Sequence, residues 1–409
     1  LLSPRALAWA GRGFWAVVVQ ALFAGTNFLV NILLARWLEP EGYGAFALGY
    51  SLFLLLGTLH TALWTEPMMV YGAKRFREAF GPYRRVLIGD HWRFGFAASL
   101  LFLLCALVFA NLGRQELALS FGGLAVAAPA VLYLWLVQRN AYVHLEPRLA
   151  AFGGVLYLVI YLLLAFFLLR LGLLNEATAY LAMGLAALLA GKAILWRLPK
   201  GTGQAVDPRE VRALHWAYGR WALLAGLLSW VPANLPLVVL AGLKGLEASA
   251  LFRATYYLYM PVLHFQTALN SLFLPLVARR LATGPEEAWG WTKRALLIHT
   301  VPAAMYLLVV PWVEPVVGLV YGGRFPEAAK VFLWLLPVPF LAAATNALEA
   351  WHRGRERSGM VAKGYAVAAL ATALILPLAV AWGGVWGAAL SLALGKGTLA
   401  AVLYLNRER

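Results

Sequence analysis

Residues 93–139 read RFGFAASLLFLLCALVFANLGRQELALSFGGLAVAAPAVLYLWLVQR, two apolar runs that are separated by a short gap. Each run has about the 20 residues with which an α-helix crosses the hydrocarbon core of a bilayer. Arg93 precedes the first run, Arg114 lies in the gap, and Arg139 follows the second run. The stretch therefore predicts a hairpin of two membrane-spanning helices.

Apolar runs of this kind recur along the whole chain of 409 residues. The composition agrees, because 62% of the residues are hydrophobic and 13% are charged, whereas a globular domain has about 25% charged residues. The last two runs are divided only by Trp382-Gly383-Gly384. We predict an all-α integral membrane protein with about twelve spanning helices, near residues 14–35, 43–64, 94–111, 117–137, 149–169, 177–196, 219–241, 248–277, 296–318, 328–350, 362–382 and 385–405.

The basic residues predict the orientation of these helices. Of the 34 Lys and Arg residues, 26 fall in alternate gaps between the runs and 6 fall in the other gaps. Membrane proteins keep an excess of Lys and Arg in their short cytoplasmic loops, so both termini are expected in the cytoplasm. The same bias accounts for the net charge of +16 without a nucleic-acid partner. The first run is too long for the apolar region of a cleavable signal peptide.

The two halves of the sequence resemble each other. At an offset of 206 residues, positions 33–70 align with 239–276 without a gap, and the identities include Tyr50 with Tyr256 and Thr61 with Thr267. Shared composition is the alternative explanation. Six helices per half predict a parallel repeat around a central cavity. We expect an N-terminal lobe over 1–200, a cytoplasmic linker with a short interfacial helix over 201–218, and a C-terminal lobe over 219–409.

Two cations inside predicted helices are the first candidates for a binding site. Lys396 lies near the middle of its helix, and Arg253 lies within two turns of the outer end of its helix. A cation at the bilayer centre costs roughly 2.5–3.5 kcal/mol, so its presence favours a function. Both could bind phosphate, Arg253 through its planar guanidinium. The alternatives are that Arg253 reaches the outer headgroups and that Lys396 pairs with a carboxylate.

Amide side chains interrupt several apolar runs and could line a hydrophilic path. Pro232 and Pro236 flank one of them and predict a bend beside a cavity. Hydrogen bonding between helices is the alternative role of such amides. The candidates are Asn27, Asn31, Asn234 and Asn270.

Acidic residues are scarce in the predicted helices. Glu66 could face the cavity, although an acid at the membrane interface is the alternative interpretation. The absence of a deep carboxylate disfavours exchange against protons or sodium ions. The sequence shows no metal-spaced cluster and no catalytic constellation, so neither a cofactor nor an enzymatic activity is expected.

Two segments carry a resemblance to a known family. They are residues 31–47, NILLARWLEPEGYGAFA, and residues 320–331, VYGGRFPEAAKV, the latter followed by an apolar run and the basic residues Arg353 and Arg355. Both resemble the Wzx-type O-antigen flippases of the multidrug/oligosaccharidyl-lipid/polysaccharide exporter (MOP) superfamily. The resemblance implies a V-shaped cavity between two six-helix lobes. It implies transport of a polyprenyl-diphosphate-linked oligosaccharide to the outer leaflet by alternating access.

The resemblance also implies a bacterial inner-membrane location and a part in lipopolysaccharide or exopolysaccharide synthesis. Membrane lipids, a polysaccharide polymerase and glycosyltransferases are then the expected partners. One alternative is an ion-coupled exporter of small molecules or drugs from the same superfamily. Another is a membrane glycosyltransferase or polymerase, which usually needs acidic residues on an outer loop. The tight turn with Glu39 and Glu41 is a poor candidate for such a loop.

Overall fold

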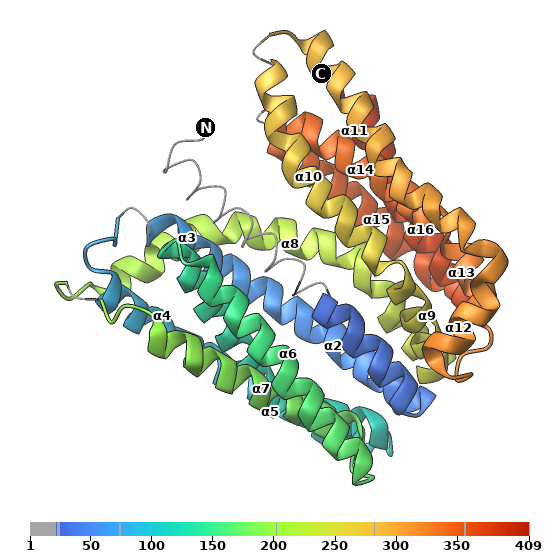
Figure 1. Ribbon diagram of the computed structural model, residues 1–409, viewed down its shortest axis with the longest axis horizontal. Coiled ribbons are helices and arrows are strands. Elements are labelled where there is room, and N and C mark those ends of the chain that lie inside the picture. Colours follow the sequence, from blue (N-terminus) through green and yellow to red (C-terminus); the bar gives the residue numbers. More distant parts are fainter. Residues whose placement is uncertain are drawn as a thin grey trace, which may run out of the picture. The chain divides into compact units, whose positions relative to one another are not determined.

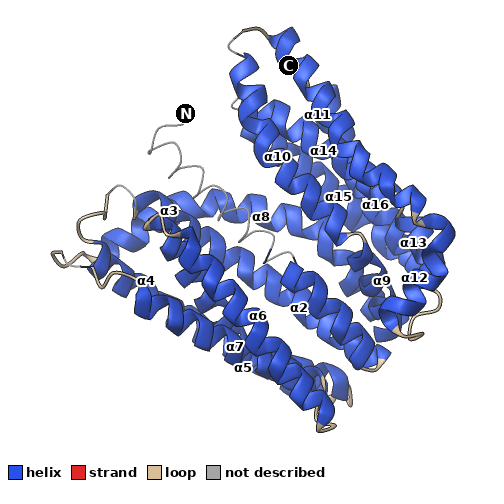
Figure 2. Cartoon of the chain, viewed as in Figure 1, coloured by secondary structure: helices blue, strands red, loops and turns tan. Residues whose placement is uncertain are grey.

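The computed structural model describes a protein whose regular elements are all helices in the described part of the chain (Figures 1 and 2). Ten helices among the described residues are long and apolar enough to cross a membrane. The predicted fold class, an all-α multi-pass membrane protein, is therefore confirmed. The described residues are 22, 25–72, 75–201, 203–281, 283–355 and 357–408.

Ten of the twelve predicted spans correspond to these ten helices. The predicted first span, 14–35, lies partly outside the described residues, which begin with 22 and continue from 25. Residues 25–37 form a helix. The predicted eighth span, 248–277, is divided between α9 (Leu246–Leu258) and α10 (Met260–Leu281). Pro261 explains the division, because proline lacks the N–H that continues a helix.

The chain divides into two compact units. Unit 1 comprises Leu1–Val30 and Gly49–Gly226, and unit 2 comprises Asn31–Leu48 and Leu227–Arg409. These bounds differ from the lobes expected at 1–200 and 219–409, because residues 31–48 belong to unit 2 and unit 1 extends to residue 226. The long helix α8 (Pro208–Lys244) carries the chain from one unit into the other.

The expected interfacial helix within 201–218 is not a separate element. Residues from Pro208 onward form the first turns of α8, which continues through Pro232 and Pro236 to Lys244. Asp207 precedes the helix, and its carboxylate accepts a hydrogen bond from the Arg209 N–H at 2.8 Å. Such an N-cap satisfies a backbone donor that the first turn leaves open.

The helix α5 is the core helix of unit 1. It packs against α4 and α7, and small residues let these helices approach closely. A Cβ at Gly184 of α7, for example, would lie 2.8 Å from the Cα of Ala127. The elements of unit 1 are the end of α2 (Pro40–His60), the π-helix η1 (Thr61–Thr65), α3 (Glu66–Tyr71), α4 (Phe80–Asn111), α5 (Gln115–Val143), α6 (Pro147–Arg170), α7 (Glu176–Arg197) and the first half of α8.

The helix α14 holds the corresponding place in unit 2, where it packs against α10, α11 and α16. The predicted break at Trp382-Gly383-Gly384 is confirmed: Gly384 has a φ of +55°, and a Cβ at Gly387 would collide with the Ala379 carbonyl. The remaining elements are α11 (Pro285–Met305), η2 (Tyr306–Leu308), η3 (Val310–Trp312), α12 (Val313–Tyr321), α13 (Ala328–Leu335), α14 (Pro337–Gly354), α15 (Ser358–Gly383) and α16 (Val385–Leu405).

Candidate functional site

Unit 2 contains a cavity of about 310 Å³ with Lys396 in its wall. Lys396 lies halfway along α16, and the preceding Gly395 lies so close to Thr372 and Pro232 that a side chain there would meet both. The close packing fixes the helix beside the cavity. Pro232 itself lines the cavity, so one of the two prolines predicted beside a cavity does lie there.

An acid that the sequence did not connect with Lys396 lies in the same wall. Glu349 of α14 is only 6% exposed and interacts electrostatically with Lys396. Tyr365 donates a hydrogen bond to Glu349 at 2.7 Å, and Arg353 forms an ion pair with it at 2.9 Å. The Glu349 carboxylate therefore has two partners besides Lys396, namely Tyr365 and Arg353. The charges of Glu349, Arg353 and Lys396 sum to +1.

The rest of the unit 2 cavity offers hydrogen-bonding groups between apolar surfaces. Such a mixture is typical of a ligand site, in which a few polar groups orient a largely apolar ligand. The polar residues of the wall besides those above are Ser229, Tyr256, His264, Thr267, Thr345 and Asn346.

Unit 1 contains a cavity of about 270 Å³ that is lined by aromatic, amide and hydroxyl side chains. Asn27, a predicted candidate, lies in its wall and accepts a hydrogen bond from Tyr50 at 3.0 Å. The other polar or aromatic residues of the wall are Thr26, Thr61, Thr65, Trp135, Gln138, Arg139, Tyr142 and Tyr157.

Arg139 is the cation of the unit 1 cavity, and sequence reasoning missed it. Its place after an apolar run predicts a loop charge, yet α5 continues past it to Val143. Arg139 is exposed, donates to the Met69 sulfur at 3.9 Å and interacts electrostatically with Glu66. Glu66 is not among the residues that line this cavity, although it interacts with the cation that does.

The two cavities occupy equivalent positions in the sequence repeat. Tyr50 and Thr61 line the unit 1 cavity, and their repeat partners Tyr256 and Thr267 line the unit 2 cavity. Further pairs of lining residues, at a spacing of 206 or 207 residues, follow the same order along both walls: Thr26 and Pro232, Asn27 and Ala233, Trp135 and Ala342, Gln138 and Thr345, Arg139 and Asn346, Tyr142 and Glu349. This correspondence supports the parallel repeat over shared composition.

Arg253 is buried rather than directed to the headgroups, since only 3% of it is exposed. Its Nη2 donates to the Tyr257 hydroxyl at 2.9 Å, and its guanidinium lies 4.5 Å from the Tyr257 ring centroid. It is absent from the lining of the unit 2 cavity as far as the described residues show. The contacts with Tyr257 favour a structural role, in which a cation–π interaction stabilises the buried charge.

The remaining predicted amides do not form one path. Asn31 is buried in unit 2 near the Tyr43 hydroxyl, at 3.5 Å, whereas Asn27 belongs to unit 1. Asn234 donates to the Trp230 carbonyl at 3.4 Å, and the Asn270 Oδ1 has no hydrogen-bond partner among the described residues. Of the four amides, only Asn27 lines one of these two cavities.

Histidines contribute a contact that the sequence did not indicate. His60 Nε2 and His91 Nδ1 lie 3.0 Å apart in the buried interior of unit 1, next to the π-helix η1. In the described part of the chain, no group of three or more His, Cys, Asp or Glu residues could hold a metal ion.

No protein-family model matches the sequence, and no curated protein matches it. Solved structures do match. An inward-facing multidrug resistance MATE family transporter of the MOP superfamily has a TM-score of 0.75 at 15% identity, covering 96% of this chain and 97% of that one. The lipid II flippase MurJ, in an inward closed conformation, has a TM-score of 0.70 at 10% identity over 98% and 87%. A eukaryotic MATE transporter has a TM-score of 0.69 at 19% identity over 97% and 95%. The chain therefore has the fold of the MOP superfamily transporters.

Proposed function

We propose that the protein is a flippase that moves a polyprenyl-diphosphate-linked oligosaccharide from the inner to the outer leaflet of the bacterial inner membrane. The observation that carries this proposal is the pair of equivalent cavities, each with a cation among the described residues of its wall: Arg139 in unit 1 and Lys396 in unit 2. These walls also contain hydroxyl, amide and aromatic groups. Alternating access with both termini in the cytoplasm is the matching mechanism and topology.

The cations suit an anionic cargo. A Lys ammonium binds phosphate oxygens as a compact charge with three donors, and an Arg guanidinium binds them with a planar pair of donors. Glu349 does not cancel this preference, because Arg353 and Tyr365 already hold its carboxylate. A diphosphate beside Lys396 would gain one charge-assisted hydrogen bond in a partly buried site.

The wall of the unit 1 cavity suits a sugar. Sugar rings present C–H faces, which pack on aromatic rings, and hydroxyl rims, which pair with amide and hydroxyl groups. Trp135 and Tyr157 provide rings in this wall, and Asn27 and Gln138 provide amides that can both donate and accept.

An exporter of small molecules is the second candidate, because MATE transporters are among the similar structures, including one described as a multidrug resistance transporter. This candidate is weakest for a cationic cargo. Arg139 and Lys396 repel a cation, and the Glu349 carboxylate near Lys396 is already bound by Arg353 and Tyr365. The cavity charges therefore favour the flippase. The similar lipid II flippase MurJ shows that the fold also occurs in a flippase.

Reconstitution into liposomes separates the two candidates. Purified protein should flip a fluorescent, short-chain prenyl-diphosphate-linked oligosaccharide, read as the label that becomes protected from a membrane-impermeant reductant. Ethidium transport by the same vesicles should stay at the level of protein-free liposomes. Ethidium transport without flipping of the labelled lipid would refute the flippase and establish the exporter.

A further inference from the structure

A separate open groove of about 430 Å³ lies in unit 1 between α4 and the first turns of α8. Its lining is mostly apolar and includes the rings of Trp64, Phe94 and Trp216. Two arginines, Arg93 and Arg212, also lie in its wall. None of these residues lines the unit 1 cavity described above, so the groove needs its own explanation.

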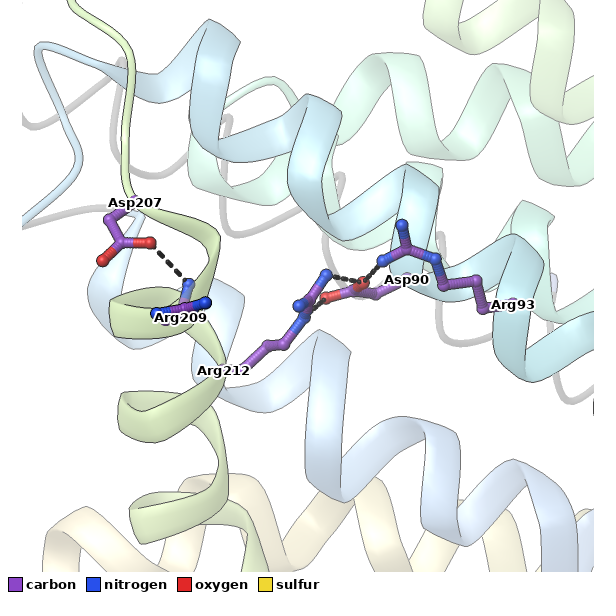
Figure 3. A network of polar contacts seen from close by, with 5 residues as sticks. All are labelled: Asp90, Arg93, Asp207, Arg209 and Arg212. Carbon is purple, nitrogen blue, oxygen red and sulfur yellow. Dashed lines mark hydrogen bonds and ion pairs between the residues drawn. The ribbon is translucent and has the colours of Figure 1, made fainter.

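The two arginines converge on one carboxylate (Figure 3). Arg212 of α8 donates to both oxygens of Asp90, from Nε at 2.9 Å and from Nη2 at 2.8 Å. Arg93 donates to Asp90 from Nη1 at 2.8 Å. A guanidinium has five N–H donors, so both arginines keep donors beyond these bonds. The side chain of Arg93 is 72% exposed and that of Arg212 is 49% exposed, whereas that of Asp90 is only 10% exposed.

The described lining of the groove carries a net charge of +1, from Arg93, Arg212 and Asp90, because its histidine, His215, is neutral. The two ring nitrogens of His215 lie 2.8 Å from the Leu63 carbonyl oxygen and 2.6 Å from the Tyr83 hydroxyl. Burial lowers the pKa of His215, so the imidazole stays uncharged at neutral pH. Two guanidinium groups against one carboxylate leave a surplus positive charge at the mouth of an apolar groove.

The position of the groove indicates what fills it. Trp216 and Trp221 are exposed on the first turns of α8, and aromatic rings of this kind settle at the headgroup level of a bilayer. The charge pattern predicts that this end of the helices faces the cytoplasm, where the leaflet carries anionic lipids. An apolar groove with a cationic mouth at this level matches a lipid with a phosphate head.

We propose that the α4–α8 groove binds an anionic phospholipid of the cytoplasmic leaflet. The phosphate would accept hydrogen bonds from the free donors of Arg93 and Arg212, and an acyl chain would lie against Trp64 and Phe94. Asp90 would hold the two guanidinium groups in place without neutralising them. The bound lipid would add to the contacts that already join the start of α8 to α4, such as the ion pair of Arg212 with Asp90.

The test is native mass spectrometry of the full-length protein from mixed micelles with equal phosphatidylglycerol and phosphatidylcholine. The wild type should retain phosphatidylglycerol preferentially. In Arg93→Gln, this preference should fall by about 3-fold to 5-fold, because the Arg93 side chain is mostly exposed and solvent screens its charge. Asp90 keeps Arg212 in this variant, so no carboxylate is left unpaired. Arg85→Gln, which removes an exposed charge from the same helix outside the groove, should keep the wild-type preference.

Three outcomes would overturn the proposal. The first is an equal preference in Arg93→Gln and the wild type. The second is an equal loss in Arg85→Gln, which would mean a general charge effect. The third is displacement of phosphatidylglycerol by equimolar farnesyl diphosphate in the wild type but not in Arg93→Gln, which would assign the groove to a prenyl diphosphate instead. Melting temperatures of all variants, measured in the same micelles, are the test that each one is folded.

Discussion

The cavities of units 1 and 2 share one framework and differ in their chemistry. Equivalent helix positions hold Arg139 and Tyr142 in unit 1 but Asn346 and Glu349 in unit 2. The unit 2 cation instead comes from α16, as Lys396, and lies near an acid that has its own partners. The exposed Arg139 donates to the Met69 sulfur and interacts electrostatically with Glu66. A repeat can therefore keep a cavity while moving its charge from one helix to another.

The largest effect is expected from Lys396→Met. The variant loses a partly buried cation, and loss of one charged hydrogen bond of about 1.5–3 kcal/mol corresponds to roughly 10-fold to 100-fold slower flipping of the prenyl-diphosphate probe. Lys396→Arg keeps the charge and should retain a larger share of the activity. Equal activity of Lys396→Met and the wild type, at equal amounts of folded protein, would remove unit 2 from the proposed site.

A smaller effect is expected from Arg139→Gln, because this guanidinium is exposed and its charge is better screened by solvent. Flipping should slow by about 3-fold to 5-fold, since exposed charges contribute about 1 kcal/mol or less. The control is Arg114→Gln, which removes an exposed arginine at the other end of α5 and should leave the rate unchanged. A loss as large as that of Lys396→Met would contradict the expectation that the unit 1 cation contributes less to transport than the unit 2 cation.

Tyr365→Phe tests whether the unit 2 acid is kept from competing for Lys396. The change removes the hydrogen bond to Glu349, worth about 1 kcal/mol, and should slow flipping about 2-fold to 5-fold as Glu349 turns toward Lys396. Combining it with Glu349→Gln should restore the rate, because the competing charge is then absent. Failure of that rescue would show that Tyr365 acts in another way.

The smallest effect on transport is expected from Arg253→Leu. The guanidinium packs on Tyr257 and is not among the residues that line the unit 2 cavity, so flipping per folded molecule should change less than 2-fold. Stability should fall by about 1–2 kcal/mol with the lost cation–π interaction. A melting curve and a transport assay on the same sample separate the two readouts. A tenfold loss of transport would restore Arg253 as a phosphate ligand.

The helices could be predicted from sequence because lipid as solvent imposes a simple length rule on apolar runs. Even the break at Gly384 was visible, since a residue with positive φ is a natural place for glycine. The run 248–277 is predicted as one span, but the structure divides it at Tyr259, two residues before Pro261. The long α8 was also missed, because its first turns are polar enough to be taken as a separate interfacial helix.

The site was less predictable because its contacts join residues far apart in the chain. Lys396 was chosen for its depth, and its interaction with Glu349 depends on the packing of α14 against α16. The sequence predicts that Arg139 lies in a loop, because the apolar run ends before it although α5 continues to Val143. The repeat did contain a usable signal: Tyr50 with Tyr256 and Thr61 with Thr267 were both aligned, and all four line the cavities.

The central claim, that the cavity cations bind the diphosphate of a lipid-linked substrate, is tested most directly by comparing the affinities of farnesyl diphosphate and farnesol. Isothermal titration of the purified wild type and of the double variant Arg139→Gln/Lys396→Met gives both values. The wild type should bind the diphosphate at least about 10-fold more tightly than the alcohol, and the double variant should lose that difference. An unchanged preference for the diphosphate in the double variant would contradict the claim.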